Sequence, residues 1–428
     1  MRRAGALCLA AGISFLAAAR ASASLVYVIN VEGVIDPPSA SYIKRAISVA
    51  ERRSAEALVI ELNTPGGSLA ATEEITQALL NARVVTVVYV SPVGGKAASA
   101  GTFITMAAHV AAMAPGTTIG AARPVFIGNE PVPPEVSEKA ANHAASMLRA
   151  IAERRGRNAE WAEKAVKKSY SVPASKAVKE KVVDLVAENL DGLMDKLDGR
   201  RVTLRPGKIV RLATSAARTE ELPPSMGERF LHALAHPEIA YILITIGVLG
   251  IIAELNHPGL IFPGMTGAIC LILAFYSLSV LSVNMAGLAL ILLGLGLLIA
   301  DIWATSHGVL TVGGVISFVV GSIMLTGGYP PELRVAWQVI IAMTAVTSGF
   351  FIFVVGMGIK AQRAPVATGK QALVGRTAQA RTPIGPTGSV FVAGELWRAK
   401  TDGERIEEGE EAEIVAVEGL TLKVRKRK

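Results

Sequence analysis

Short apolar runs alternate with amphipathic stretches in the N-terminal part of the chain. Three of the runs have the length and β-branched content of buried strands: residues 25–31, 58–62 and 84–90. Between them, residues 39–50 place apolar side chains on one helical face, and Ser68 can cap a second helix that extends to about Ala82. Strands that alternate with helices predict βαβ units and a mainly parallel sheet.

The same alternation continues further along the chain. Apolar residues at helical spacing predict helices at residues 103–113, 135–154, 158–168 and 191–197. Residues 175–187 predict a helix followed by a strand, and residues 124–134, rich in Pro and Gly, predict a loop. Residues 201–229 show little periodicity and predict an extended linker. The first globular domain is therefore expected to occupy residues 24–200.

A long apolar region follows the linker. The chain has no Lys or Arg from Phe230 through Leu333. Five apolar runs lie in or just after this stretch: residues 239–253, 260–283, 285–302, 309–326 and 335–359. A helix needs about 20 apolar residues to cross a bilayer, so the first run either spans or re-enters. We therefore expect a transmembrane domain over residues 230–360, with four or five spans.

Charges at the two ends of this arrangement predict its orientation. Residues 1–23 begin with Arg2 and Arg3, continue through an apolar run and end in a small-residue cleavage pattern. This is the layout of a secretory signal peptide, the alternative being an uncleaved anchor. Lys360, directly after the last apolar run, predicts a cytoplasmic end there. The first domain is therefore expected outside the cytoplasm, in a protein of the cell membrane.

Residues 371–428 have a different pattern. Short strand-like runs are separated by Gly and Pro turns at regular intervals, which predicts a small all-β barrel. Few aromatic residues are available for base stacking, with Phe391 and Trp397 as the candidates. We therefore predict protein contacts for this domain and no nucleic-acid binding.

Composition supports this division of the chain. Hydrophobic residues make up 51% and charged residues 18%, which is too apolar for a wholly soluble protein. The net charge of +8 includes a basic tail at residues 423–428, suited to contact with anionic lipid. The two cysteines, Cys8 and Cys270, exclude a disulfide framework. No residues have metal-ligand spacing and no phosphate loop is present, so no cofactor is predicted. Asp301 lies near the end of the apolar run 285–302 and is either part of an ion or proton relay or an interfacial residue.

Candidate chemistry centres on Ser99, which lies among small residues between a predicted strand and a predicted helix. The free N–H groups of a helix N-terminus favour a developing oxyanion. A Ser hydroxyl needs a base, and a desolvated Lys such as Lys139, on the predicted helix 135–154, can serve. Lys96 is a rival that more naturally faces solvent. His109 and His143 are weighed as bases and interpreted as packing residues.

Two segments carry a family resemblance. The sequence KAASAGTFITMAAHVAAMAPGTTIGAARP, starting at Lys96, and NTPGG at residues 63–67 resemble the membrane-bound serine proteases of the NfeD family. The resemblance implies an α/β ClpP/crotonase-like spiral domain, a multi-span α-helical membrane domain and a small all-β OB-like domain at residues 371–428.

The resemblance also implies functional residues. These are a Ser99–Lys139 catalytic dyad, an oxyanion hole from the N–H groups of Gly67 and Ala100, and a substrate strand beside Gly66 and Gly67. It implies a serine endopeptidase that cleaves apolar segments of membrane-associated proteins, a stomatin (SPFH-type) membrane partner, and a homo-oligomer. Two alternatives are a non-catalytic membrane scaffold that partners stomatin-like proteins and a crotonase-like acyl-CoA enzyme. The presence of both Ser99 and Lys139 counts against each.

Overall fold

The computed structural model describes most of the chain. The described residues are 24–126, 132–256, 259, 261–281, 283–304, 308–328, 334–363 and 370–427. The predicted signal peptide lies outside them. The chain divides into two compact units, Met1–Leu298 with Ser306–Thr347, and Ile299–Thr305 with Ser348–Lys428.

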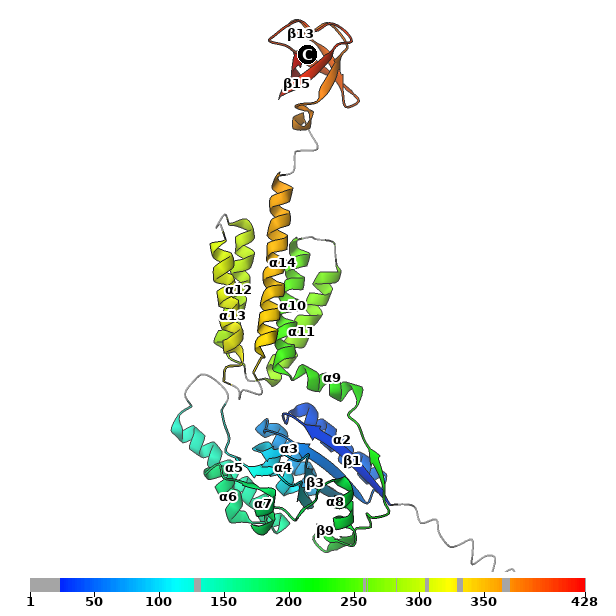
Figure 1. The fold of residues 1–428 in the computed structure, drawn as a ribbon, viewed down its shortest axis with the longest axis vertical. Helices are drawn as coiled ribbons and strands as arrows, with labels where there is room; N and C mark the ends of the chain where they lie inside the picture. The colour runs from blue at the N-terminus through cyan, green and yellow to red at the C-terminus, as the bar shows by residue number, and fades with distance from the viewer. Residues whose placement is uncertain are drawn as a thin grey trace, which may run out of the picture. The chain divides into compact units, whose positions relative to one another are not determined.

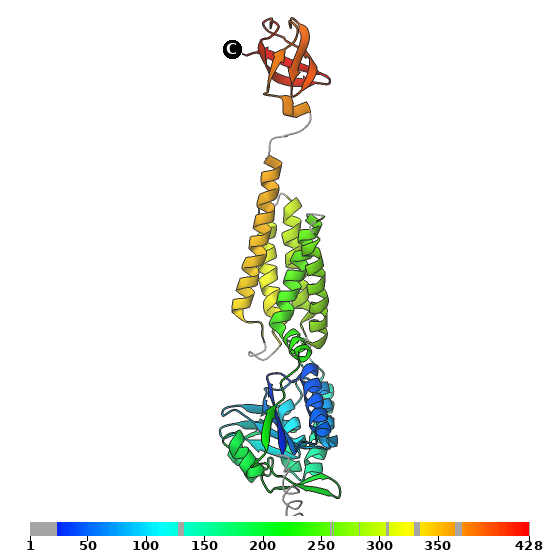
Figure 2. The same ribbon diagram turned by 90° about the vertical axis from the view of Figure 1, so that its right-hand side faces the viewer.

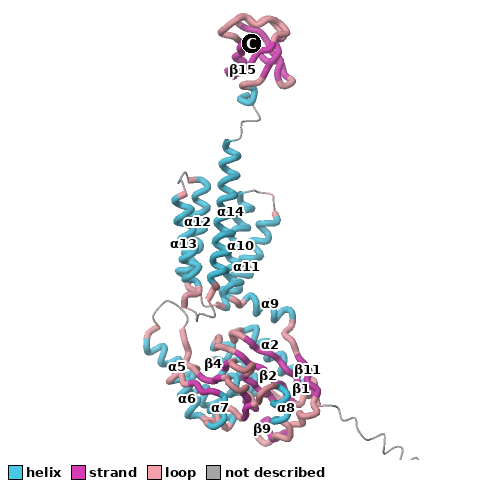
Figure 3. Tube along the Cα trace, in the orientation of Figure 1, coloured by secondary structure: helices cyan, strands magenta, loops and turns pink. Residues whose placement is uncertain are grey.

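A six-stranded parallel sheet forms the centre of the N-terminal domain (Figures 1 and 3). Its strands, in spatial order, are β11 (Arg218–Glu221), β1 (Leu25–Glu32), β2 (Ala57–Asn63), β3 (Val85–Val90), β5 (Val110–Met113) and β8 (Leu185–Val186). The three strands predicted from apolar runs are therefore adjacent in the sheet. Their registers bring Val28, Val59 and Val87 into one row. Both faces of these strands are buried, which is why they appear in the sequence as nearly continuous apolar runs.

Helices cover both faces of the sheet. They are α2 (Pro37–Arg52), α3 (Leu69–Asn81), α4 (Ala100–Ala107), α5 (Pro134–Arg155), α6 (Ala159–Lys167), α7 (Ala174–Lys179) and α8 (Leu190–Leu197). One core holds Ile60 of β2 with side chains of α2 to α6, and the other holds Val59 with Leu193 of α8. The helix predicted at residues 135–154 is confirmed as α5, which is ended by Gly156 in the left-handed conformation at φ 68°.

A second, smaller sheet positions the functional site. β4 (Lys96–Ala98) pairs in parallel with β6 (Thr118–Gly120), which pairs antiparallel with β7 (Ser171–Pro173). Short strands of this sheet alternate along the chain with strands of the main sheet and with helices. The predicted α/β spiral of the ClpP/crotonase type is thereby confirmed.

Two sequence predictions in this domain are wrong. Residues 103–113 were expected to form one helix, but α4 ends at Ala107 and Val110–Met113 is strand β5. An apolar run that is buried on all sides does not distinguish a helix from a strand. Residues 201–229 are not an extended linker either, because β11 continues the main sheet beside β1.

The remaining residues of the expected linker are also ordered. β9 (Arg201–Arg205) and β10 (Lys208–Arg211) form an antiparallel hairpin, and α9 (Met226–Leu234) follows β11. Val202 and Leu204 of β9 are buried in the same core as α8. β11 is exposed along its whole length, so it lacks the alternation of apolar and polar residues that marks a half-buried strand.

Five apolar helices follow α9 in the part of the chain that the structure describes. They are α10 (Pro237–Asn256), α11 (Phe262–Val280), α12 (Met285–Trp303), α13 (Val309–Leu325) and α14 (Trp337–Arg363). Pro237–Leu255 and Phe262–Ser279 are long and apolar enough to cross a membrane, and Met285–Asp301, Val309–Leu325 and Trp337–Phe353 are shorter apolar segments. α10 is one uninterrupted helix of 20 residues, or about 30 Å at the rise of an α-helix, the thickness of a bilayer core. The helix extends beyond both ends of the apolar run at residues 239–253. The run alone is shorter than the length that a membrane-spanning helix needs.

Glycines set the close approach of these helices, and α10 to α13 run alongside one another (Figure 2). A Cβ on Gly294 of α12 would lie 2.7 Å from the carbonyl oxygen of Gly314 of α13. Further along the same pair of helices, a Cβ on Gly287 would lie 2.9 Å from the carbonyl oxygen of Gly321. Small residues at such crossings let backbones pack directly, as in other membrane helix pairs. The hydroxyl of Ser322 on α13 also donates a hydrogen bond to Tyr241 Oη on α10 at 2.9 Å.

The C-terminal residues form a closed barrel. Its strands are β12 (Thr377–Ala380), β13 (Thr387–Val392), β14 (Glu395–Lys400), β15 (Glu411–Glu418) and β16 (Thr421–Lys426), in the order β12-β13-β14-β16-β15. A single 3₁₀ turn, η2 (Lys370–Leu373), precedes them. Val390, Ile414 and Leu422 fill the interior. The predicted OB-like barrel is confirmed.

Candidate active site

Ser99 occupies the junction between β4 and α4. Its backbone has φ 49° and ψ −112°, a conformation that non-glycine residues rarely adopt and that costs free energy. The Ser99 N–H donates a hydrogen bond to the carbonyl oxygen of Gly120 on β6 at 3.1 Å. The hydroxyl of Thr102 bonds the same oxygen at 2.9 Å and the carbonyl oxygen of Ala97 at 2.9 Å. The small sheet thus holds Ser99 in a strained conformation at the start of a helix.

Gly66 lies directly against the Ser99 side chain. A Cβ on Gly66 would lie 2.8 Å from Ser99 Cβ and 3.3 Å from Ser99 Oγ. Gly66 also has φ 133°, which disfavours any side chain at this position. Ser99 Oγ forms no hydrogen bond with any residue that the structure describes. The Ser99 hydroxyl therefore lies beside the backbone of Gly66 and is not engaged in a hydrogen bond with another described residue.

Two backbone N–H groups next to Ser99 have no acceptor among the described parts of the chain. They belong to Gly67 and Ala100, the residues predicted for an oxyanion hole. Ile35 N–H donates to the carbonyl oxygen of Gly66 at 2.9 Å, and Ser68 N–H donates to that of Ile35 at 2.8 Å, so the N–H of Gly67 points away from Ile35. Ala100 is the first residue of α4, where helix N–H groups lack intrahelical partners.

The structure gives its own reason for glycine at position 67. A Cβ there would lie 2.1 Å from the carbonyl oxygen of Ile35. Close packing against Ile35 therefore requires glycine at position 67, whether or not a substrate strand binds beside it. The predicted substrate contacts of Gly66 and Gly67 stay predictions.

Two arginines that sequence reasoning missed hold the opposite end of α4. Arg155 Nε donates to the carbonyl oxygen of Ala107 at 2.8 Å. Arg157 Nη1 donates to those of Met106 and Ala108 at 2.5 and 2.9 Å. Burial lowers the pKa of Arg155 to about 10, so the guanidinium keeps its charge. These guanidinium groups donate hydrogen bonds to the free carbonyl groups at the end of α4, and their positive charge interacts favourably with the negative end of the helix dipole. The basic run around Gly156 was the available signal.

Lys139 lies in the second turn of α5 and is exposed. The buried face of α5 carries Ala141, Ala144, Ala145, Leu148, Ile151 and Ala152. Helical spacing places Lys139 on the opposite face. No hydrogen bond or ion pair joins Lys139 to Ser99 within the described residues. The apolar surroundings expected for Lys139 are therefore not formed by α5 in the single chain.

Comparisons with known proteins cover the whole chain. Profiles of the NfeD1b N-terminal domain, the NfeD integral membrane domain and the NfeD-like C-terminal, partner-binding domain match residues 25–193, 238–357 and 370–426. The chain is 34% identical to the membrane-bound protease PH1510 of Pyrococcus horikoshii. The match covers 97% of this chain and 96% of that protein. The chain belongs to the NfeD family. At this identity and coverage it is a membrane-bound protease.

Further known proteins are similar to this chain. Membrane protein NfeD1b of Bacillus subtilis is 26% identical, with 95% of this chain and 94% of that protein covered. Among solved structures, a lysine-to-alanine mutant of the 1510-N membrane-bound stomatin-specific protease, in complex with a substrate peptide, is 32% identical. That match covers 50% of this chain and 98% of the other, with a TM-score of 0.46.

Within the described residues of this NfeD protein, neither His109 nor His143 forms a hydrogen bond with Ser99. His109 is buried, with Nδ1 accepting from Thr86 N–H at 3.2 Å and Nε2 donating to the carbonyl oxygen of Leu204 at 3.2 Å. Burial, together with the charge of Arg155, lowers the pKa of His109 to about 4. His143 is exposed, 3.8 Å from a Glu73 carboxylate oxygen. His109 is therefore a packing residue, and His143 belongs to the surface between α3 and α5.

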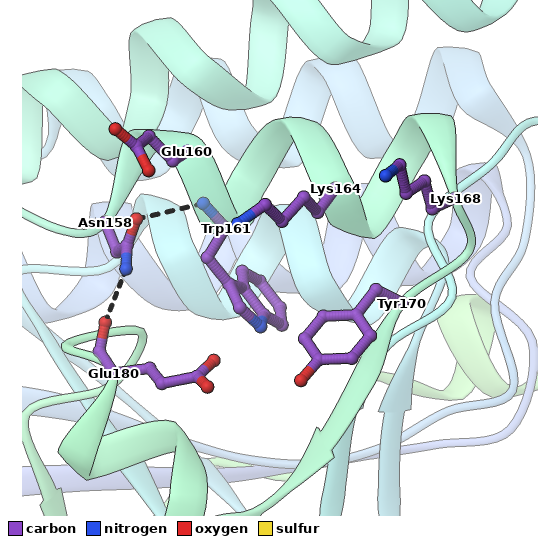
Figure 4. A pocket seen from close by; sticks show the side chains of 7 residues that line it. All are labelled: Asn158, Glu160, Trp161, Lys164, Lys168, Tyr170 and Glu180. Atoms are coloured by element: carbon purple, nitrogen blue, oxygen red, sulfur yellow. Dashed lines mark hydrogen bonds between the residues drawn. The ribbon is translucent and has the colours of Figure 1, made fainter.

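A polar cavity of about 400 Å³ lies beside α6, and Ser99 is not one of its lining residues (Figure 4). Its walls are Asn158, Glu160, Trp161, Lys164, Lys168, Tyr170 and Glu180. The Asn158 side chain accepts from Trp161 N–H and donates to the carbonyl oxygen of Glu180, both at 2.9 Å. These bonds cap α6 and join it to the end of α7, so we interpret the cavity walls as structural. Among the residues that the structure describes, no group of His, Cys, Asp and Glu could hold a metal ion.

Proposed function

We propose that this NfeD protein is a membrane-anchored serine endopeptidase in which Ser99 is the nucleophile and Lys139 the general base. The observation that carries the proposal is the geometry around Ser99. Its hydroxyl lies against Gly66 and has no hydrogen-bond partner in the described chain, and the unpaired N–H groups of Gly67 and Ala100 flank it. Backbone strain at a defined residue is typical of functional sites.

The residues perform acyl transfer in two steps. The neutral amine of Lys139 takes the proton of Ser99 Oγ as this oxygen attacks the scissile carbonyl carbon. The N–H groups of Gly67 and Ala100 stabilise the negative charge on the carbonyl oxygen. The C–N bond then breaks, the leaving amine takes the proton from Lys139, and an acyl ester on Ser99 remains. Water, deprotonated by Lys139, hydrolyses the ester and restores both residues.

Lys139 must lose contact with water to act as a base near neutral pH, because burial disfavours the charged amine. On the single chain it is exposed. We propose that a bound substrate segment and a second copy of the chain cover it. A homo-oligomer is thus part of the proposal. A monomer obtained by separating the oligomer in detergent should show no peptide cleavage.

The substrate and partner are proposed to be membrane proteins of the stomatin type, as the names of the 1510-N structures indicate for that relative. A solved structure of the C-terminal domain of the stomatin operon partner protein 1510-C from Pyrococcus horikoshii is 35% identical to this chain. The match covers 97% of that domain and 14% of this chain, with a TM-score of 0.14. Because residues 370–426 match the NfeD-like partner-binding domain, we propose that the barrel makes the partner contact. Ser99 would then cleave an apolar segment near the membrane.

The proposed topology places the protease domain outside the cytoplasm and the barrel inside. It is supported by the five apolar helices α10 to α14, since an odd number of spans separates the two ends. Cysteines introduced at Val125 and Leu420, which are 83% and 74% exposed, test it in a chain lacking Cys8 and Cys270. A membrane-impermeant maleimide should label position 125 in intact cells and position 420 only after lysis. Labelling of both before lysis would contradict the topology.

Peptide cleavage by the full chain in liposomes tests the dyad. Ser99→Ala and Lys139→Ala should each reduce kcat by about 10⁴-fold or more, because residues that act as a unit lose nearly everything singly. Lys96→Ala is the matched control, since Lys96 is close in sequence to Ser99 but lies on β4, and it should retain activity. If Lys139→Ala kept activity and His143→Ala lost it, the base would be misassigned.

A further inference from the structure

The polar face of α9 is turned toward the protein. Nδ1 of His232 donates to an Asp36 carboxylate oxygen at 2.8 Å. Glu228 accepts two hydrogen bonds from Arg45 of α2, at 2.8 and 2.7 Å. Glu228 also completes a capping box with Ser225. Helix α9 is therefore fixed to α2 through its charged residues.

The apolar face of α9 is turned outward. Met226, Phe230 and Leu231 are 79%, 52% and 37% exposed. At helical spacing Met226 and Phe230 occupy the side opposite Glu228 and His232, and Leu231 lies at the edge of this apolar face, nearer to Glu228. A helix on the surface of a soluble domain has the reverse orientation, with its apolar stripe against the core. This reversal requires a cover for the three outward side chains.

The position of α9 in the chain identifies the cover. α9 ends at Leu234, and α10, which is long enough to span a membrane, begins at Pro237. Leu234 is buried, and its carbonyl oxygen accepts a hydrogen bond from the hydroxyl of Ser277 on α11. The last turn of α9 is thus attached to the spanning helices, and its outward face lies where the chain enters the bilayer.

We propose that Met226, Phe230 and Leu231 insert into the lipid headgroup region, so that α9 is an interfacial helix that seats the protease domain on the bilayer. Interfacial helices bury an apolar face to a depth of about 5–10 Å and keep basic residues near the lipid phosphates. Arg229, exposed on α9, is suited to the second role. Because the polar face is bonded to α2, insertion of α9 also fixes the distance of the protease domain from the membrane. The proposal does not depend on Ser99 being catalytic.

Depth measurement by spin labelling tests the insertion. Single cysteines are placed at Met226 and at Phe230 in the full chain lacking Cys8 and Cys270, which is reconstituted into liposomes containing anionic lipid. The control is a cysteine at Val136, which is 48% exposed on α5. Collisions with oxygen, which concentrates in lipid, are compared with collisions with a water-soluble nickel complex.

The oxygen-to-nickel collision ratio should be several-fold higher at positions 226 and 230 than at position 136. A ratio at both α9 positions equal to that at position 136 would show that α9 lies in water. Protection from both reagents would show that a protein surface, such as a second copy of the chain, covers α9. Either of these results would overturn the proposal. Gel filtration and circular dichroism of the labelled chains confirm that each variant is folded.

Discussion

The carboxylate of Asp36 joins α2 to His232 of α9. One oxygen accepts from Ser39 N–H at 2.8 Å and caps α2, and the other accepts from His232 Nδ1 at 2.8 Å. Asp36 is only 6% exposed, so the carboxylate depends on these donors. The preceding residue, Ile35, is bonded to the segment that contains Gly67. Asp36 and Ile35 thus connect the helix before the membrane to the backbone that flanks Ser99.

The first prediction concerns the pH dependence of this contact. The hydrogen bond to Asp36 raises the pKa of His232 against the opposing effect of burial. Glu228 and Arg229 lie about one turn earlier on α9, and Asp36 is the group at the start of α2 that contacts the imidazole. Stabilisation by protonated His232 is therefore fully present below the ordinary histidine pKa of about 6.5. It is lost as the pH rises through the raised pKa of the folded protein.

The test is thermal unfolding of His232→Ala at two pH values. Because the side chain is 47% exposed, the ionic contribution should be about 1 kcal/mol or less. His232→Ala should lower the Tm of the full chain more at about pH 6, where the imidazole is protonated, than at about pH 9, where it is neutral. His236→Ala is the control, since this exposed neighbour has no side-chain bond within the described chain. An equal loss at both pH values would assign the contact to a neutral hydrogen bond.

The second prediction concerns Gly66. Gly66→Ala should reduce peptide cleavage by about 100-fold, because displacement of a reacting group by about 1 Å has effects of that size. The cause is the overlap of the new methyl group with Ser99. Gly94→Ala is the matched control: Gly94 has φ 83° but no atom within 4 Å of an added Cβ. Both variants should lose about 1–2 kcal/mol of stability from backbone strain. If Gly94→Ala lost activity equally, strain alone would explain the result.

Local sequence patterns were sufficient for much of the fold. The strands at residues 25–31, 58–62 and 84–90 were predictable because they are apolar, β-branched and bounded by turns. Strand β5 was not predictable as such, since its four residues follow α4 within one apolar run and only the neighbouring strands define it. Strand β11 is defined by its pairing with β1, about 190 residues away in sequence, which no local pattern records.

The candidate site divides in the same way. Ser99 and Ala100 were predictable because a strand–helix junction is local. Arg155 and Arg157 were not, because their role depends on the carbonyl groups of α4, about 50 residues earlier. The helix that carries Lys139 was predictable from its periodicity, but the apolar surroundings expected for Lys139 are not formed in the described chain, where this side chain is exposed.

The third prediction concerns acid stability. The pKa of His109 is lowered to about 4 in the folded protein, chiefly by burial, whereas the unfolded chain binds the proton near the ordinary value of 6.5. The stabilising effect of the neutral ring is therefore complete above pH 6.5 and is lost as the pH falls toward 4. The loss should be about 3 kcal/mol.

His109→Gln should flatten the dependence of unfolding free energy on pH within this window, although the variant is less stable at neutral pH because the bonds to Thr86 and Leu204 change. Chemical denaturation of parent and variant from about pH 7 to about pH 4 measures the slope over the range of the shift. His143→Gln, at an exposed position on α5, is the control and should leave the slope unchanged. A slope that persisted in His109→Gln would assign the acid sensitivity to other groups.

The fourth prediction concerns the contact between α12 and α13. A Cβ on Gly314 would lie 2.9 Å from the carbonyl oxygen of Gly294, and the backbone there cannot yield as a flexible side chain can. Gly314→Leu should therefore destabilise the full chain in detergent by about 3 kcal/mol or more, at the upper end of overpacking effects. Gly296→Leu is the matched control, because an added Cβ on Gly296, which lies on the partner helix α12, meets no atom within 4 Å. Thermal unfolding should show a large loss for the first variant and little change for the second. Equal losses would contradict the assignment to the α12–α13 contact, because the higher helix propensity of leucine stabilises both positions and cannot cause a loss.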